Sequence, residues 1–398
     1  MPLEAIFRQA LEAVDPYQAV ISNWPELGPA QTWLLAVGKA APAMARACAE
    51  QLGEQLAGGV VLTKDEHLGT FVHPRLTLFE AAHPVPDQRG LEATEFILRQ
   101  LDGWDQRVLV ALSGGASSLL VAPVPGLTLA DLAEVNRRLL ASGATIEQVN
   151  IVRKHLSQVK GGQLALRVTG PLVTLALSDV VGSPADVIGS GPTVPDRSTL
   201  AQARTLADSM GLELPMRETP KGDEAVFSRS LYRVVGDNRL LAQAALTAGR
   251  DHFERVELWS DRVEGEARLV AEQLAAEGRR RQAGGWRGLV VASGETTVTL
   301  SGSGRGGRCQ ELALAFALAA QDTSLRLLAG ASDGTDGPTD AAGAMVDGAT
   351  VTTALDLGLE ASLYLEAHDS YAFFERAGGH LKTGPTGTNV NDLLLMEC

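Results

Sequence analysis

Five apolar, strand-like runs in this chain each end in a loop rich in glycine, serine, threonine and aspartate. They occupy residues 108–118, 174–183, 290–297, 327–337 and 381–389. Such runs are typical of buried parallel strands, and open α/β sheets bind ligands beyond the carboxyl ends of their strands. Glycine lets backbone amides approach a phosphate closely, and carboxylates can hold a metal ion. The pattern therefore predicts a site for a small anionic ligand, with phosphate as the favoured group.

Length and composition limit the class of protein. With 398 residues the chain is too long for one ordinary core, which predicts two domains. Its formal net charge of −14 argues against nucleic acid as the main partner. No apolar stretch is long enough to span a membrane, and the start of the chain shows no signal peptide. Cys48, Cys309 and Cys398 have no paired spacing, so we expect a reducing, cytoplasmic location without a zinc site or a disulfide framework.

Apolar periodicity alternates between strand and helix along the first half of the chain. Strands are expected at residues 34–37, 60–63, 76–80, 108–112 and 172–177, with helices at 40–53, 88–101, 128–142 and 145–159. This alternation predicts an α/β fold with a parallel sheet covered by helices on both faces. Residues 211–230 show little periodicity and are expected to form a linker or an exposed excursion. Beyond them, strands are expected at 231–235 and 256–258, and helices from 238 and over 264–281.

Two segments after these strands carry groups that suit an anion. Ser113-Gly114-Gly115-Ala116-Ser117-Ser118 predicts a nest of amides with hydroxyl donors, suited to phosphate or carboxylate. Lys39 stands where the strand over 34–37 meets its helix, so its ammonium could reach an anion there. The alternatives are a tight turn without a ligand and a solvated surface lysine.

Carboxylates follow two later strands. Asp179 could ligate magnesium or accept a hydroxyl proton, unless it only caps the next helix. Asp333, Asp336 and Asp340 are spaced three and four residues apart through a glycine-rich loop. Closely spaced oxygen ligands suit Mg²⁺ or Ca²⁺, whereas Asx-turns that stabilise the loop are the alternative.

Residues 302–307 match the dinucleotide pattern G-x-G-x-x-G, but a stretch so rich in glycine meets that pattern easily. Arg308 and Glu311, at the start of the following predicted helix, are more informative. An arginine there can form a fork to a carboxylate or to transferring phosphoryl oxygens. No Walker A sequence is present, so phosphoryl transfer cannot be argued from a P-loop.

Taken together, these segments resemble the class II glycerate kinases, also called the MOFRL family. The resemblance spans nearly the whole chain. Its matching stretches are residues 36–40, 83–87, 113–117, 154–162, 177–193, 294–298, 304–311, 332–343 and 384–392. Proteins of this family phosphorylate D-glycerate with ATP and Mg²⁺, usually giving 2-phosphoglycerate.

The resemblance implies a Rossmann-like, parallel-sheet N-terminal domain over residues 1–230 and a smaller α/β C-terminal domain over 231–398. The active site is expected in the cleft between them. D-glycerate and a nucleotide are the implied partners, with neither nucleic acid nor membrane involved. A homodimer is compatible with the resemblance.

Roles for individual residues follow from the same resemblance. Lys39 and Arg308 are expected to face each other across the cleft and to hold the glycerate carboxylate or stabilise the transferred phosphoryl group. Asp179 is expected to bind Mg²⁺ or to orient the attacking hydroxyl, with Asp333 or Asp336 as the competing metal ligand. Expected substrate or phosphate contacts are Ser113, Gly114, Gly115, Ser117, Ser118, Lys154, Gly189, Gly191, Glu295 and Glu311. Cys309 stands where the family is expected to carry asparagine.

Two other functions stay open on sequence grounds. An NAD(P)H-dependent hydroxypyruvate reductase would use the pattern at 302–307, although that pattern lies late in the chain rather than in a first βαβ unit. A non-catalytic sensor of sugar acids or nucleotides would keep the scaffold without turnover. Lys39, Asp179 and Arg308 all stand where the resemblance places them, which argues against such a sensor.

Overall fold

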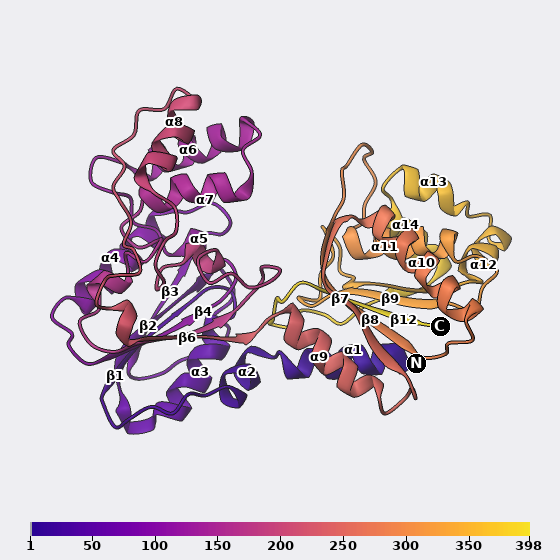
Figure 1. Cartoon of the computed structure of the whole chain (residues 1–398), viewed down its shortest axis with the longest axis horizontal. Helices are drawn as coiled ribbons and strands as arrows, with labels where there is room; N and C mark the ends of the chain where they lie inside the picture. Colours follow the sequence, from indigo (N-terminus) through magenta and orange to yellow (C-terminus); the bar gives the residue numbers. More distant parts are fainter. Residues whose placement is uncertain (1) are drawn as a thin grey trace. The chain divides into compact units, whose positions relative to one another are not determined.

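The computed structural model describes residues 2–398, which form two compact units (Figure 1). The N-terminal unit comprises residues 16–178 and 183–235, and the C-terminal unit comprises residues 2–15, 179–182 and 236–398. Helix α1 (Pro2–Ala13) belongs to the C-terminal unit because it buries its apolar face beside α9 (Asn238–Gly249). The expected border at 230/231 therefore differs from this division in three places: α1, residues 179–182 and most of strand β6.

The N-terminal unit is built on a six-stranded sheet with the strand order β3-β2-β1-β4-β5-β6. The pairings among β1 to β5 are all parallel, so the predicted parallel sheet is confirmed. The strands are β1 (Thr32–Val37), β2 (Leu56–Lys64), β3 (Leu76–Ala81), β4 (Arg107–Leu112), β5 (Leu172–Leu177) and β6 (Ser230–Gly236). The chain builds outward from β1 through β2 and β3, then crosses to β4 on the other side. The carboxyl ends of β1 and β4 are therefore the switch point where such sheets bind ligands.

Helices cover both faces of this sheet. In Figure 1, α2 and α3 lie on one face and α4 and α5 on the other. Helices α6, α7 and α8 pack around a separate small core that includes Val135, Val149 and Leu156. The helices are α2 (Pro16–Ser22), α3 (Ala41–Leu52), α4 (Gln88–Leu101), α5 (Ala116–Leu119), α6 (Leu129–Ala141), α7 (Ile146–His155) and α8 (Leu200–Ser209), with 3₁₀ turns at Gly53–Gln55, Ala165–Arg167, Ile188–Ser190 and Phe227–Arg229. Helix α8 was not predicted from the sequence.

The C-terminal unit carries a second six-stranded sheet with the order β11-β10-β9-β12-β8-β7. Its strands are β7 (Val256–Glu266), β8 (Leu289–Thr297), β9 (Arg326–Ala331), β10 (Gly343–Asp347), β11 (His380–Leu381) and β12 (Asp392–Glu397). Strand β12 runs antiparallel between β8 and β9. Because of this direction, the carboxyl ends of β8 and β9 lie on either side of the first residue of β12. Strand β7 is longer than predicted and includes residues 264–266, which were expected to start a helix.

Helices also cover both faces of this second sheet (Figure 1), with α1 and α9 on one face and α10, α11 and α14 on the other. The remaining helices are α10 (Ala267–Ala283), α11 (Arg308–Ala319), α12 (Thr350–Asp356), α13 (Ala361–Glu366) and α14 (Ser370–Ala377). Phe316 of α11 and Phe373 of α14 are fully buried in the core on that face. No helix within residues 2–398 is long and apolar enough to cross a membrane.

Candidate functional site

The loops after β1 and β4 are joined at the switch point of the N-terminal sheet. The Lys39 amide donates to the Gly114 carbonyl over 2.9 Å, and the Ala40 amide donates to Ser113 Oγ over 3.1 Å. Gly38 has φ 123°, and a Cβ there would lie 2.2 Å from Ser113 Oγ, so only glycine allows this approach. The buried Ser113 hydroxyl therefore ties the two loops together, and its predicted contact with a ligand stays a prediction.

The hydroxyls of Ser117 and Ser118 are also hydrogen-bonded within the protein, whereas two backbone amides of their loop are free. Ser117 Oγ lies 2.6 Å from Ser190 Oγ, and Ser118 Oγ donates to the Gly115 carbonyl over 3.0 Å. The amides of Gly114 and Gly115 donate to no acceptor among residues 2–398. Two neighbouring free amides after a strand are the elements of an anion nest. The predicted nest therefore has its free donors in the backbone rather than in the hydroxyls, and its binding of an anion stays a prediction.

Lys39 lies beside this nest without a carboxylate partner. A Cβ on Gly115 would lie 3.1 Å from the His83 ring and 3.3 Å from Lys39 Cγ, so the three residues adjoin. No carboxylate in the described chain lies within ion-pair distance of the Lys39 ammonium. Burial, with the charges of Lys39 and Lys64 adding to it, lowers the pKa of His83 to about 4. The switch point therefore carries the positive charge of Lys39, which no carboxylate of residues 2–398 pairs with.

Lys154 contrasts with Lys39, although both were predicted to contact ligand. Its buried ammonium pairs with Asp196 over 3.1 Å and with Asp186 over 3.5 Å. Gly189 and Gly191 lie in the segment that leads to Asp196, and a Cβ on Gly189 would be 3.0 Å from Leu112 Cδ1. Lys154 and Gly189 thus have structural roles in the fold. The predicted ligand contacts of Lys154, Gly189 and Gly191 stay predictions.

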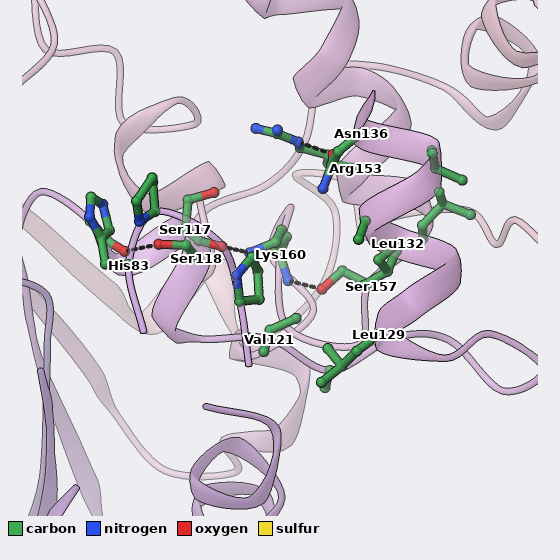
Figure 2. A pocket seen from close by; sticks show the side chains of 17 residues that line it. His83, Ser117, Ser118, Val121, Leu129, Leu132, Asn136, Arg153, Ser157 and Lys160 are labelled. Atoms are coloured by element: carbon green, nitrogen blue, oxygen red, sulfur yellow. Dashed lines mark hydrogen bonds between the residues drawn. The ribbon is translucent and has the colours of Figure 1, made fainter. Parts of the chain in front are cut away.

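A cavity of about 350 Å³ opens beside the serine loop within the N-terminal unit (Figure 2). Ser117 and Ser118 lie on one side of Lys160, and Leu129 and Leu132 of α6 lie on the other. The Lys160 ammonium donates to the backbone carbonyl of Ser117 and to that of Leu120, the latter over 3.1 Å. Burial, and the nearby Arg153, lower the pKa of Lys160 to about 7.

Sequence reasoning identified only one side of this cavity, through Gly115, Ser117 and Ser118. Asn136, Arg153 and Lys160 all line it, and none of them was predicted as a site residue. Lys160 stands before two glycines, which is a local signal of unusual backbone. The positions of Asn136 and Arg153 depend on how α6 packs against α7, and no local pattern indicates that packing.

In the C-terminal unit, Arg308 makes a bidentate fork with Asp392. Its Nε and Nη2 donate to the two carboxylate oxygens over 2.6 and 2.8 Å, and its Nη1 lies 3.3 Å from Glu295. Asp392 begins β12 and Arg308 begins α11, so the fork fastens that helix to the centre of the sheet. Burial, with Asp336 and Glu295 adding to it, raises the pKa of Asp392 to about 7 in spite of the fork. The fork of Arg308 is thus made to a carboxylate of the protein, and its predicted contact with substrate or phosphate stays a prediction.

Asn391 brings two predicted site residues of the C-terminal unit together. Its side-chain amide nitrogen donates to Glu295 Oε2 and to the Asp179 carbonyl, each over 2.8 Å. Asn391 is buried, and its Oδ1 has no hydrogen-bond partner among the described residues. A buried acceptor without a donor is costly unless a ligand satisfies it. Asn391 lies within the matched segment 384–392 but was not singled out.

Asp336 and Asp333 occupy different environments in their loop. The buried Asp336 carboxylate accepts from the amides of Cys309 and Gln310 over 3.1 and 2.8 Å, so it caps the start of α11. Burial raises the pKa of Asp336, against these hydrogen bonds. Asp333 is half-buried, and its Oδ1 accepts from the Thr335 amide over 3.0 Å, which is an Asx-turn.

Glu311 is buried and accounted for by protein partners. It accepts from Arg268 Nε over 2.7 Å and lies 2.9 Å from His368 Nδ1. No group of three or more His, Cys, Asp or Glu side chains in residues 2–398 is arranged to hold a metal ion. The substrate role of Glu311 and the metal roles of Asp179, Asp333 and Asp336 stay predictions.

Comparison with known proteins finds two matching family models and relatives that match nearly the whole chain. A domain of unknown function, DUF4147, matches residues 2–219, and the MOFRL family matches residues 288–392. A D-glycerate 2-kinase of Thermotoga maritima is 39% identical over 98% of this chain and 96% of its own length. A protein of Agrobacterium vitis with the provisional name hydroxypyruvate reductase is 38% identical over 98% of this chain and 92% of its own length. The crystal structure of a glycerate kinase from Thermotoga maritima has a TM-score of 0.95 at 38% identity, covering 100% of this chain and 98% of that one.

Proposed function

We propose that this chain, which belongs to the glycerate kinase family with a MOFRL domain, transfers the terminal phosphoryl group of ATP to the 2-hydroxyl of D-glycerate with the aid of Mg²⁺. The observation that carries the proposal is the switch point of the N-terminal sheet. There Lys39 lacks a carboxylate partner and adjoins the free amides of Gly114 and Gly115.

Electrostatics explain why such a place suits this reaction. Glycerate and a nucleoside triphosphate are both anions, whereas the chain has a formal net charge of −14. Binding therefore requires local positive charge, and phosphoryl transfer depends mainly on positioning and charge neutralisation. Lys39 and the two amides would hold an anionic oxygen and orient it. Truncation of a group in such a role typically costs about 10²-fold or more in kcat.

The residues of the C-terminal unit offer a partial fit to a hard cation such as Mg²⁺. Oxygen ligands suit this ion, which usually takes one or two carboxylates together with substrate phosphates and water. Asn391 Oδ1 is a buried oxygen without a donor, and the same side chain contacts Glu295 and the Asp179 carbonyl. Asp336 is the weaker candidate, because its two carboxylate oxygens already accept from the amides of Cys309 and Gln310. When bound, Mg²⁺ would neutralise charge on phosphate oxygens, with Asp179 or Asp333 as its protein carboxylate.

The reductase alternative draws no support from the glycine-rich pattern at 302–307. A Cβ on Gly302 or on Gly304 would lie 2.5 Å from the Ala367 carbonyl, and a Cβ on Gly307 would lie 2.3 Å from the Asp336 carboxylate. Close packing therefore accounts for these glycines. The three cysteines are free and buried, and we infer a reducing, cytoplasmic location from them.

The test is to incubate the protein with D-glycerate, ATP and Mg²⁺ and to follow ADP release and the product by ³¹P NMR. We expect stoichiometric ADP and a 2-phosphoglycerate signal. A parallel reaction with hydroxypyruvate and NADH should leave the NADH absorbance unchanged. Oxidation of NADH without ADP release would overturn the proposal in favour of the reductase.

A further inference from the structure

The cavity beside the serine loop differs from the rest of this acidic chain in its charge. The sequence contains 48 acidic and 34 basic side chains, yet no Asp or Glu is among the residues that line the cavity. Arg153 and Lys160 both line it. A wall that carries two basic side chains and no carboxylate selects an anionic ligand.

Arg153 is suited to an anionic ligand because its side-chain partner is a neutral amide. Its Nε donates to Asn136 Oδ1 over 2.6 Å, and no carboxylate in residues 2–398 lies within ion-pair distance of its guanidinium. Burial lowers the pKa of Arg153 from its ordinary value. A partly desolvated guanidinium held by a neutral amide keeps its other N–H donors for a phosphate or carboxylate.

The opposite half of the cavity is apolar. Leu129 and Leu132 of α6 are half-buried and face the cavity (Figure 2). Val135 and Leu156 also line it. A three-carbon hydroxy acid has no apolar part that would need such a wall. A volume of about 350 Å³ is instead within the range of cofactor pockets, which are mostly apolar with a few placed polar groups.

We propose that this cavity binds the nucleoside triphosphate, with the base against Leu129 and Leu132 and the phosphates toward Ser117 and Arg153. The inference rests on the proposed function, because it locates the phosphate donor that a kinase requires. Gly115 lines the cavity and adjoins Lys39, so the phosphate chain would extend from the cavity to the switch point. Lys160 acts as a positioning residue, since its ammonium holds the carbonyl of Ser117.

Two exposed alanines of α6 provide a matched test. Ala133 lines the cavity, whereas Ala130, one turn earlier on the same helix, does not. Ala133→Trp should occupy the space of the base and raise the KM for ATP at least tenfold, with the KM for D-glycerate changed less than twofold. Ala130→Trp should leave both values within twofold of the wild type.

Each result decides between the sites. Equal KM values for ATP in the two variants, or a raised KM for D-glycerate alone in Ala133→Trp, would overturn the nucleotide assignment while leaving the kinase function standing. If the wild type shows no turnover, equilibrium dialysis with ATP still decides the location. Weaker ATP binding in Ala133→Trp than in Ala130→Trp supports the cavity, and equal binding overturns it.

Photolabelling of the wild type covers the case in which a variant does not fold. The probe is 8-azido-ATP, with labelled peptides identified by mass spectrometry. We expect label within residues 121–136, and excess ATP should remove it. Label confined to peptides of the C-terminal unit would contradict the assignment, whatever the enzymatic activity.

Discussion

Lys39 and Arg153 of the N-terminal unit differ in their partners from Arg268 and Arg308 of the C-terminal unit. Lys39 and Arg153 have no carboxylate within ion-pair distance in the described chain, and each adjoins a loop or a cavity. Arg308 is forked to Asp392, and Arg268 is paired with Glu311. An unpaired cation is available to an anionic ligand, whereas a paired cation mainly holds elements together. Lys39 and Arg308, which are equal candidates for catalysis in the sequence, therefore differ in the structure.

The largest effect is expected for Arg308→Met, which breaks the fork. Removal of one partner from a buried pair costs roughly 3 kcal/mol or more, because the other charge is left uncompensated. The free energy of unfolding from urea titration should fall by that amount. If Arg308 also contacts the transition state, as its place in the family implies, kcat should fall by about 10²-fold or more.

A double variant separates these two roles. Arg308→Met combined with Asp392→Leu removes both charges and should recover much of the lost stability. Activity that returned together with stability would show that Arg308 acts only through the fold. Activity that stayed low in a stable double variant would support a direct role.

Lys39→Met should show the opposite balance. Because its ammonium has no carboxylate partner, the free energy of unfolding should change by less than about 0.5 kcal/mol. Loss of its contact with an anion should lower kcat/KM by about 10²-fold. A variant with normal kcat/KM, or one that unfolds as readily as Arg308→Met, would end the contrast between the two regions.

The two aspartates of the 333–340 loop should differ in their response to magnesium. Asp333→Asn should raise the Mg²⁺ concentration for half-maximal activity by about tenfold. Asp336→Asn should leave that concentration nearly unchanged and should lower stability by about 1 kcal/mol, because it weakens the cap of α11. A magnesium titration of both variants checks this pair, and the reverse pattern would make Asp336 the metal ligand.

The smallest effect concerns pH. Because the folded state lowers the pKa of His83 from 6.5 to about 4, the unfolded chain binds more protons between those values. The contribution of neutral His83 to the free energy of unfolding is complete above pH 6.5 and is lost as the pH falls toward 4. Unfolding midpoints at pH 5 and pH 7 should therefore lie closer together in His83→Gln than in the wild type. His83 is only partly buried, so the difference is expected to be small, and an identical difference in both proteins would contradict it.

Much of the N-terminal fold could be predicted from the sequence because its signals are local. The helix expected over 88–101 and the strand expected over 172–177 match α4 and β5. The helix has an amphipathic pattern and the strand is a continuous apolar run, so the two are easily told apart. Strand β12 was missed although Leu393 to Met396 form an apolar run directly after the glycine-rich segment. Its pairing with β8 and β9 is long-range, and no local pattern indicates it.

The candidate site divides in a similar way. The residue types of the loops at Lys39 and at Ser113–Ser118 indicate anion binding without any knowledge of the fold. Arg308 and Lys154 pair with carboxylates of the protein, and Glu311 pairs with an arginine of the protein. All of these partners come from distant segments, so the sequence could not indicate the pairs. Arg153 and Asn136 were missed for the same reason, since α7 brings the arginine to α6.

The most direct test of the account is a crystal structure with a non-hydrolysable ATP analogue and D-glycerate bound. We predict the base beside Leu132, and anionic oxygens within hydrogen-bond distance of Lys39 and of the Gly115 amide. Arg308 should keep its fork with Asp392. A nucleotide bound away from the N-terminal cavity, with Lys39 in contact with no anion, would contradict the claim that the unpaired cations serve the ligand.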